Sequence, residues 1–218
     1  MIFLEGLGFA AMLVLAYLVG AVPFGLIVGK VFYDVDVRQH GSGNVGTTNV
    51  FRVLGKKAGV VVMVLDIMKG YVPALLAVLI LDSHPWYVIF VAAAPVVGHM
   101  YSVFLKGSGG KGVATGAGVV LALYPLAFLI CFATWIALIL VTRYVSVASL
   151  TVAVLVPVLV ILHHDPLPYE IAGVLVGIIV WWAHRGNIRR LLKGTESRVT
   201  LPWSGKRSTV AGSGGGRS

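Results

Sequence analysis

AGVVVMVLDIMKGYVPALLAVLIL, residues 58–81, is an apolar run interrupted by only two charged side chains, Asp66 and Lys69. A helix needs roughly 20 apolar residues to cross about 30 Å of hydrocarbon, so this run predicts a membrane-spanning helix. Asp66 and Lys69 are three residues apart and share one helical face, where their charges can neutralise each other. Because charge inside a membrane is costly, the pair has either a direct functional role or a purely structural one.

Six further apolar runs surround this one: 7–29, 86–105, 112–123, 125–141, 147–162 and 169–183. The whole chain is 58% hydrophobic and 11% charged, with a mean hydropathy of +0.95, well outside the range of soluble domains. These features predict an all-α integral membrane protein of about seven transmembrane helices. Only Tyr124 separates two of the runs, which together are too long for one crossing, so we expect a tight hairpin there.

The formal net charge of +9 raises the question of a nucleic-acid partner, but the positive residues are placed as in a membrane protein. Every Lys and Arg except Lys69 falls in alternate connections, at 30–57, 106–111, 142–146 and 184–218. The positive-inside rule makes that side cytoplasmic, with the N-terminus outside and the C-terminus inside. No nucleic-acid partner is therefore expected.

One membrane domain, residues 1–203, is expected to be followed by a flexible basic tail, residues 204–218, which has almost nothing apolar to pack. The first apolar run has Glu5 before it and no basic segment, so it is interpreted as a retained helix rather than a signal peptide. The lone Cys131 lies in an apolar run, which excludes disulfides and cysteine-rich metal sites, and we expect no metal.

The first polar motif is GSGNVGTTNVFRVLGKKAG, residues 41–59. Its glycines allow several backbone N–H groups to converge on one anion, and short polar side chains add donors. Arg52 follows on an expected short helix and can bind phosphate through two hydrogen bonds. The pattern also fits the dinucleotide fingerprint, but a membrane helix precedes it where a strand is required. A loop that only turns the chain is the remaining alternative.

The second motif is GHMYSVFLKGSGGKGVATGAG, residues 98–118, in which glycines surround Lys111 just before helix-forming residues. Anions favour such a helix N-terminus. A Walker A loop is excluded, because Leu105 stands where a glycine is required and Gly112 where a hydroxyl residue is required. Lys111 could instead be a lysine that contacts lipid headgroups, and His99 is either a base or a structural hydrogen-bonding residue.

The third motif is HRGNIRRLLKGTE, residues 184–196. Its basic residues could simply enforce topology and bind anionic lipid. His184 and Asn187 do not carry the full positive charge that orients helices, so they are better candidates for a site.

Together, the three motifs resemble those of the bacterial acyl-phosphate:glycerol-3-phosphate acyltransferase family, PlsY, in order and spacing over nearly the whole chain. The resemblance implies transfer of a fatty acyl group from acyl phosphate to the 1-position of glycerol 3-phosphate, without a cofactor. The products would be lysophosphatidic acid and phosphate, in the first step of phospholipid biosynthesis. It also implies a bacterial cytoplasmic membrane location, an active site facing the cytoplasm, and functional links to the enzyme that makes acyl phosphate and to the following acyltransferase.

Carried over position by position, the resemblance implies catalytic roles for Ser42, Arg52, Lys111, His184 and Asn187. It implies substrate-binding roles for Gly43, Asn44, Gly46, Thr48, Asn49, Gly109, Gly110, Gly112 and Glu196, the glutamate being as plausibly structural as catalytic. The chain departs from the family where Thr47 replaces a common alanine, Ser102 a common proline, and Gly107 and Ser108 a bulky residue and a second lysine. The last change leaves more of the phosphate binding to Lys111.

The absence of two common catalytic arrangements is consistent with an acyl phosphate as the donor. No His is followed by Asp five positions on, and no Ser-His-acid triad is evident. An acyl phosphate is already activated, so positioning and oxyanion neutralisation can supply most of the catalysis. We expect the glycerol hydroxyl to attack directly and the donor phosphate to take its proton. An anion transporter and a noncatalytic lipid-binding scaffold are the competing hypotheses, but transporters tend to place their sites at the midplane, whereas these polar motifs lie at one face.

Overall fold

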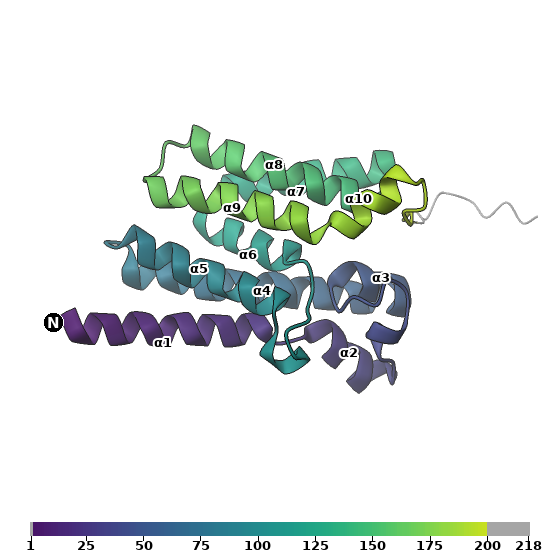
Figure 1. The fold of residues 1–218 in the computed structure, drawn as a ribbon, viewed down its shortest axis with the longest axis horizontal. Helices are drawn as coiled ribbons and strands as arrows, with labels where there is room; N and C mark the ends of the chain where they lie inside the picture. Colours follow the sequence, from purple (N-terminus) through teal and green to yellow (C-terminus); the bar gives the residue numbers. More distant parts are fainter. Residues whose placement is uncertain (1, 200–218) are drawn as a thin grey trace, which may run out of the picture.

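The computed structural model describes residues 2–199, and within that range the regular structure is helical, with no strand (Figure 1). The predicted tail, residues 204–218, lies outside the described residues. The α-helices are α1 (Ile2–Ala21), α2 (Phe24–Tyr33), α3 (Thr47–Leu54), α4 (Lys56–Leu81), α5 (Pro85–Met100), α6 (Val113–Leu123), α7 (Pro125–Thr142), α8 (Val145–Leu162), α9 (Leu167–Ala183) and α10 (Arg185–Leu192). Two short 3-10 helices, η1 (Val37–Gln39) and η2 (Val103–Leu105), lie in the loops. The predicted all-α class is confirmed.

The helices form two groups, α1 with α4 and α5, and α7 with α8 and α9, while α6 lies between them and contacts both α4 and α7 (Figure 1). Glycines allow the closest of these approaches. A Cβ atom added at Gly70 of α4 would lie 2.0 Å from the Thr115 carbonyl of α6, and one added at Gly118 would lie 2.0 Å from the Ile67 carbonyl. Small residues at helix contacts are the usual means of packing in membranes, so the two glycines fix α6 against α4.

Within residues 2–199, four helical segments are long and apolar enough to cross a membrane: α4, α5 extended through η2, α7 and α8. Two bent pairs, α1 with α2 and α9 with α10, raise the number to as many as six. Helix α6 has 11 residues and spans only about 16 Å at 1.5 Å per residue. The expected break at Tyr124 is confirmed, because α6 ends at Leu123 and α7 begins at Pro125. Seven crossings and the orientation of the termini remain predictions.

The predicted single helix over residues 7–29 is wrong. The chain bends by 42° between α1 and α2, at Val22 and Pro23. Proline has no N–H and so cannot continue a helix's hydrogen bonding. The Val22 carbonyl at this break accepts a hydrogen bond of 2.9 Å from Lys69, which anchors the bend to α4.

The predicted span over residues 86–105 agrees with one candidate crossing, Pro85–Leu105, but its regular α-helix, α5, stops at Met100. Ser102 then leaves the helix, and its hydroxyl donates a hydrogen bond of 2.6 Å to the Ala21 carbonyl at the end of α1. The chain that follows forms the loop of the second motif, so this early end is what brings the loop beside α1 and α2.

The three polar motifs lie at one end of the helix bundle, opposite the start of α1 (Figure 1). Hydrogen bonds join them there: Asn44 to Gly109 between the first and second motifs, and Lys111 to Asn187 between the second and third. The charge pattern predicted that these connections share a face, and the fold brings them together.

Candidate active site

Asn49 organises the first loop from inside. Its side chain is only 2% exposed, and its amide nitrogen donates to the Val37 carbonyl at 2.9 Å and the His40 carbonyl at 3.1 Å. Its oxygen accepts a hydrogen bond of 2.8 Å from the Ser42 N–H. Because these contacts use both ends of the amide, Asn49 holds the loop in shape and positions Ser42. The substrate contact implied for Asn49 stays a prediction.

Glycines turn this loop as its sequence predicts. Gly41 and Gly43 have φ angles of 63° and 70°, in the left-handed region that favours glycine. The turn leaves Ser42 exposed, and its hydroxyl has no protein partner among residues 2–199. Thr48 and Arg52 are exposed on α3, the short helix expected after the loop. These three side chains are free to meet a ligand.

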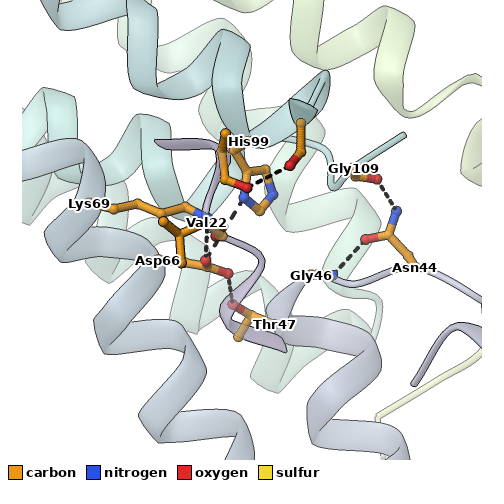
Figure 2. A network of polar contacts seen from close by, with 10 residues as sticks. Val22, Asn44, Gly46, Thr47, Asp66, Lys69, His99 and Gly109 are labelled. Atoms are coloured by element: carbon orange, nitrogen blue, oxygen red, sulfur yellow. Dashed lines mark hydrogen bonds and ion pairs between the residues drawn. The ribbon is translucent and has the colours of Figure 1, made fainter. Parts of the chain in front are cut away.

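Asn44 joins the first and second loops. Its side-chain oxygen accepts a hydrogen bond of 2.8 Å from the Gly46 N–H, and its amide nitrogen donates to the Gly109 carbonyl at 3.3 Å (Figure 2). Gly46 caps the N-terminus of α3. The single side chain of Asn44 therefore fixes the start of α3 against the second loop.

The second loop lies close to the end of α5. The Gly110 N–H donates a hydrogen bond of 3.0 Å to the His99 carbonyl, and Gly112 turns the chain into α6 with a φ of 78°. Lys111 stands between these two glycines, at the point where the loop enters the helix. The predicted arrangement of a glycine-rich loop before a helix N-terminus is confirmed.

Lys111 connects this loop to the third motif, because its ammonium group donates to the Asn187 side-chain oxygen. The Asn187 amide nitrogen in turn donates to Glu196 at 2.6 Å. Asn187 is buried, with 8% of its surface exposed. The lysine is thus held by an asparagine that is itself held by a carboxylate.

Glu196 is the anchor of this chain of contacts. Besides Asn187, its carboxylate accepts hydrogen bonds of 2.8 Å from Ser146 and 2.7 Å from Arg190. Burial opposes ionisation of Glu196, but hydrogen bonds from Asn187, Arg190 and Ser146 outweigh it and hold the pKa below its ordinary value. Glu196 thus contacts Asn187, Arg190 and Ser146, and these contacts favour the structural role over the substrate-binding one, both of which the sequence left open.

Replacing Glu196 by Gln is expected to lower the melting temperature and to reduce kcat/KM about tenfold. An amide NH2 group would face one of the three donors that now meet a carboxylate, and a buried unsatisfied donor costs about 1–3 kcal/mol. Thermal unfolding and enzymatic activity measured on the same preparation check this. Glu5→Gln, which removes the same charge at an exposed position, is the control. Wild-type values for both quantities in Glu196→Gln would contradict the anchoring role.

Ser146 was not predicted by the sequence. It lies at the start of α8, 50 residues before Glu196, in a connection with no glycine-rich motif. The segment after Glu196 also contacts the connection between α7 and α8, because the Val199 N–H donates to the Arg143 carbonyl at 2.8 Å. The only signal in the sequence was that this connection belongs to the basic side.

His184 is buried between α9 and α10, with 3% of its surface exposed. Its Nδ1 lies 2.8 Å from the Val180 carbonyl. A carbonyl only accepts, so Nδ1 carries the proton, and in the neutral ring Nε2 is left as an acceptor.

Positive charge is concentrated around Lys111. Burial, followed by the nearby positive charges of Arg190 and Arg52, lowers the pKa of Lys111 to about 8, although Glu196 partly opposes the shift. Arg190, from the third motif, is joined to the lysine through Glu196 and Asn187, and the positive charge of Arg52, from the first motif, also acts on the lysine. Because cations brought together in this way repel one another, the site favours the binding of an anion.

The fold brings together all three predicted motifs. One connected chain of contacts joins Lys111, Asn187 and Glu196. The exposed side chains of the first motif include Ser42 in the loop and Thr48 and Arg52 on α3. No group of three metal-ligating side chains occurs within the part of the chain that the structure describes. The groups that meet here are cations, amides and backbone N–H groups, and such groups recognise anions.

Known proteins have similar sequences and similar folds. The model of the glycerol-3-phosphate acyltransferase family matches residues 10–194 of the chain. The glycerol-3-phosphate acyltransferase of Geobacillus kaustophilus (strain HTA426) is 47% identical over 199 residues, which cover 91% of this chain and 99% of that protein.

Two solved structures are also similar. One is PlsY (YgiH), an integral membrane glycerol 3-phosphate acyltransferase, in its glycerol 3-phosphate form, with a TM-score of 0.85 and 42% identity. The other is the lysophosphatidic acid form of PlsY (YgiH), with a TM-score of 0.83 and 41% identity. In both cases the match covers 88% of this chain and 96% of the other.

Proposed function

The chain belongs to the glycerol-3-phosphate acyltransferase family, and we propose that it transfers a fatty acyl group from acyl phosphate to the 1-hydroxyl of glycerol 3-phosphate. It is a multi-pass membrane enzyme. The observation that carries the donor assignment is the cluster of Lys111, Arg52 and Arg190 where the two glycine-rich loops meet. Two phosphate groups must lie close together in this reaction, and several converging cations suit that purpose.

Lys111 and the N–H groups of the second loop bind the phosphate of glycerol 3-phosphate. Asn187 and Glu196 hold the lysine in place, so its ammonium group does not have to be ordered when the substrate arrives. Arg52 and the Ser42 hydroxyl, which are both exposed in the first motif, bind the phosphate of the donor. The two substrates are thus assigned to neighbouring parts of one site.

The reaction needs no covalent enzyme intermediate. The 1-hydroxyl oxygen attacks the acyl carbonyl carbon, a new ester C–O bond forms, and the bond from that carbon to the phosphate oxygen breaks. The departing phosphate takes the hydroxyl proton, giving lysophosphatidic acid and inorganic phosphate. Arg52 neutralises charge on the donor phosphate as it leaves, and His184 is available to accept a hydrogen bond through Nε2.

We place the enzyme in the bacterial cytoplasmic membrane with this site facing the cytoplasm. The support is the positive-inside rule, applied to the end of the bundle where the three motifs meet. The acyl phosphate is then supplied by the enzyme that makes it, and the product passes to a following acyltransferase.

The pH dependence of glycerol 3-phosphate use should report the titration of Lys111. Below its pKa of about 8 the lysine is protonated and binds phosphate, and above it the charge is lost. We therefore expect kcat/KM for glycerol 3-phosphate to fall above about pH 8, after correction for spontaneous hydrolysis of the donor. In Lys111→Arg the guanidinium stays protonated, so this fall should disappear. A wild-type profile that stays flat up to about pH 9.5 would rule out the lysine as its source.

The proposed reaction is tested by its stoichiometry. Purified protein in lipid, given acyl phosphate and labelled glycerol 3-phosphate, should release one inorganic phosphate for each lysophosphatidic acid formed. An anion transporter would move phosphate across a vesicle without forming the acyl product. Phosphate movement without lysophosphatidic acid would therefore overturn the enzyme assignment.

A further inference from the structure

Three buried polar residues lie beneath the two glycine-rich loops (Figure 2). They are Asp66 and Lys69 of α4 and His99 of α5, exposed by 1%, 4% and 7% respectively, and we call them the loop-floor cluster. The Lys69 ammonium lies 2.8 Å from Asp66 Oδ1, and His99 Nδ1 lies 3.8 Å from the same oxygen. The roles given above to the exposed side chains leave these three without a function.

The cluster holds the first loop through Thr47. The Thr47 hydroxyl donates a hydrogen bond of 3.3 Å to Asp66 Oδ2, and Thr47 is the first residue of α3. Lys69 also donates to the Val22 carbonyl, at the break between α1 and α2. The ion pair is therefore attached to the start of α3, which directly follows the first loop, and to the break before α2.

His99 supports the second loop. Its carbonyl accepts the Gly110 N–H, and a Cβ atom added at Gly110 would lie only 1.9 Å from His99 Nε2. A Cβ atom added at Gly109 would lie 2.1 Å from the His99 carbonyl oxygen. Neither glycine has a positive φ, so the reason for glycine here is the close contact with His99 and not the backbone conformation.

We propose that the loop-floor cluster is a positioning device that sets the separation of the two phosphate-binding loops, with His99 as the spacer under Gly109 and Gly110. The inference rests on the proposed function, because it concerns the site assigned to glycerol 3-phosphate. Asn44 ties the same two loops together above the cluster. The loops are therefore fixed on both sides before a substrate binds.

An ion pair suits this role better than an apolar floor would. Burying charges costs free energy, which is recovered only when the geometry of the pair and its hydrogen bonds is good. A small shift of either loop would break the contact of Thr47 with Asp66 or the contact of Gly110 with His99. Asp66 and Lys69 also neutralise each other, so the cluster adds no net charge to the phosphate site above it.

A double-mutant cycle tests the spacer. Gly110→Ala should raise the dissociation constant for glycerol 3-phosphate at least tenfold, because the new methyl group meets the His99 ring. His99→Ala should weaken binding severalfold, because the loop loses its support. In the double variant the methyl group can occupy the space left by the ring, so binding should be tighter than in Gly110→Ala alone. Gly116→Ala, where a Cβ atom meets nothing within 4 Å, is the matched control.

Calorimetry measures the dissociation constant for glycerol 3-phosphate whether or not acyl transfer is observed. This test is therefore separate from the test of the proposed function. Where transfer is measured, KM should follow the dissociation constant while kcat changes less than about threefold. A double variant that binds no better than Gly110→Ala would overturn the proposal, since the methyl group would then act on the substrate directly. A loss of kcat at unchanged KM in His99→Ala would also overturn it, by indicating proton transfer.

Thr47 provides a second test that leaves the buried charges in place. Thr47→Val keeps the volume and removes the hydroxyl, and it should weaken glycerol 3-phosphate binding about threefold, in line with the loss of one hydrogen bond. Thr47→Ser keeps the hydroxyl and should bind like the wild type. Equal dissociation constants for the Val and Ser variants would contradict the link through Asp66, even if neither His99 variant folds.

Discussion

Lys111→Ala is expected to raise the KM for glycerol 3-phosphate by about 100-fold while the protein still folds. A hydrogen bond to a charged group contributes about 1.5–3 kcal/mol, which corresponds to roughly a 10- to 150-fold change in affinity. The upper part of that range applies because the family resemblance implies a second lysine where this chain has Ser108, which leaves more of the phosphate binding to Lys111. Steady-state kinetics with glycerol 3-phosphate as the varied substrate give the value.

Lys106→Ala is the matched control for this variant. Lys106 is an exposed lysine of the same loop, with no ion pair among residues 2–199. It should leave the KM within about twofold of the wild type, because surface charges contribute little. An unchanged KM in Lys111→Ala, with the melting temperature also unchanged, would remove Lys111 from the glycerol 3-phosphate site.

Arg52→Ala is expected to reduce kcat/KM for acyl phosphate by about 100- to 1,000-fold. Removing a donor that stabilises developing charge in a transition state has effects of this size. Its guanidinium is exposed and makes no ion pair within the described residues, so the loss should fall on substrate contacts and leave the fold intact. Arg52→Lys should recover only part of the activity, because an ammonium group cannot make two parallel hydrogen bonds to phosphate.

Lys56→Ala controls for a general loss of positive charge near the first loop, since Lys56 is exposed at the start of α4. Its kinetics should match the wild type. If Arg52→Ala and Lys56→Ala change kcat/KM equally, Arg52 acts only through the surface potential, and its assigned contact with the donor is wrong.

Much of the fold follows from the sequence, because apolar length and charge placement act locally along the chain. The positions where helices bend or end were harder to predict. Pro23 lies inside an apolar run that is long enough to cross a membrane unbroken, and the bend there also depends on Lys69, 47 residues away, which binds the exposed carbonyl of Val22. The early end of α5 likewise depends on the contact of Ser102 with Ala21, 81 residues distant in the chain.

The candidate site also has some features that the sequence predicts and others that it does not. Glycine spacing predicts where the loops turn, and the left-handed conformations of Gly41, Gly43 and Gly112 agree with it. The internal use of Asn49 and the anchoring of Glu196 by Ser146 could not be predicted. Each depends on which donor the fold places beside an amide or a carboxylate, and a polar residue in a glycine-rich motif is equally suited to bind substrate or backbone.

Thr47 illustrates the limit most clearly. As a departure from the alanine common in the family it had no assigned role, yet its hydroxyl contacts Asp66 on the neighbouring helix, 19 residues later. The sequence predicted the pairing of Asp66 with Lys69 from their spacing, and the structure confirms it. The sequence left open what the Asp66–Lys69 pair does, because His99 and Thr47, which contact Asp66, come from other parts of the chain.

The most direct test of the account is a comparison of acyl donors. Purified protein in lipid would receive labelled glycerol 3-phosphate with long-chain acyl phosphate, acyl-CoA or acyl carrier protein, and Lys111→Ala would serve as the low-activity reference. We predict lysophosphatidic acid from acyl phosphate alone, at a rate far above that of the variant. Efficient transfer from acyl-CoA or acyl carrier protein, with none from acyl phosphate, would contradict the proposed donor and the mechanism built on it.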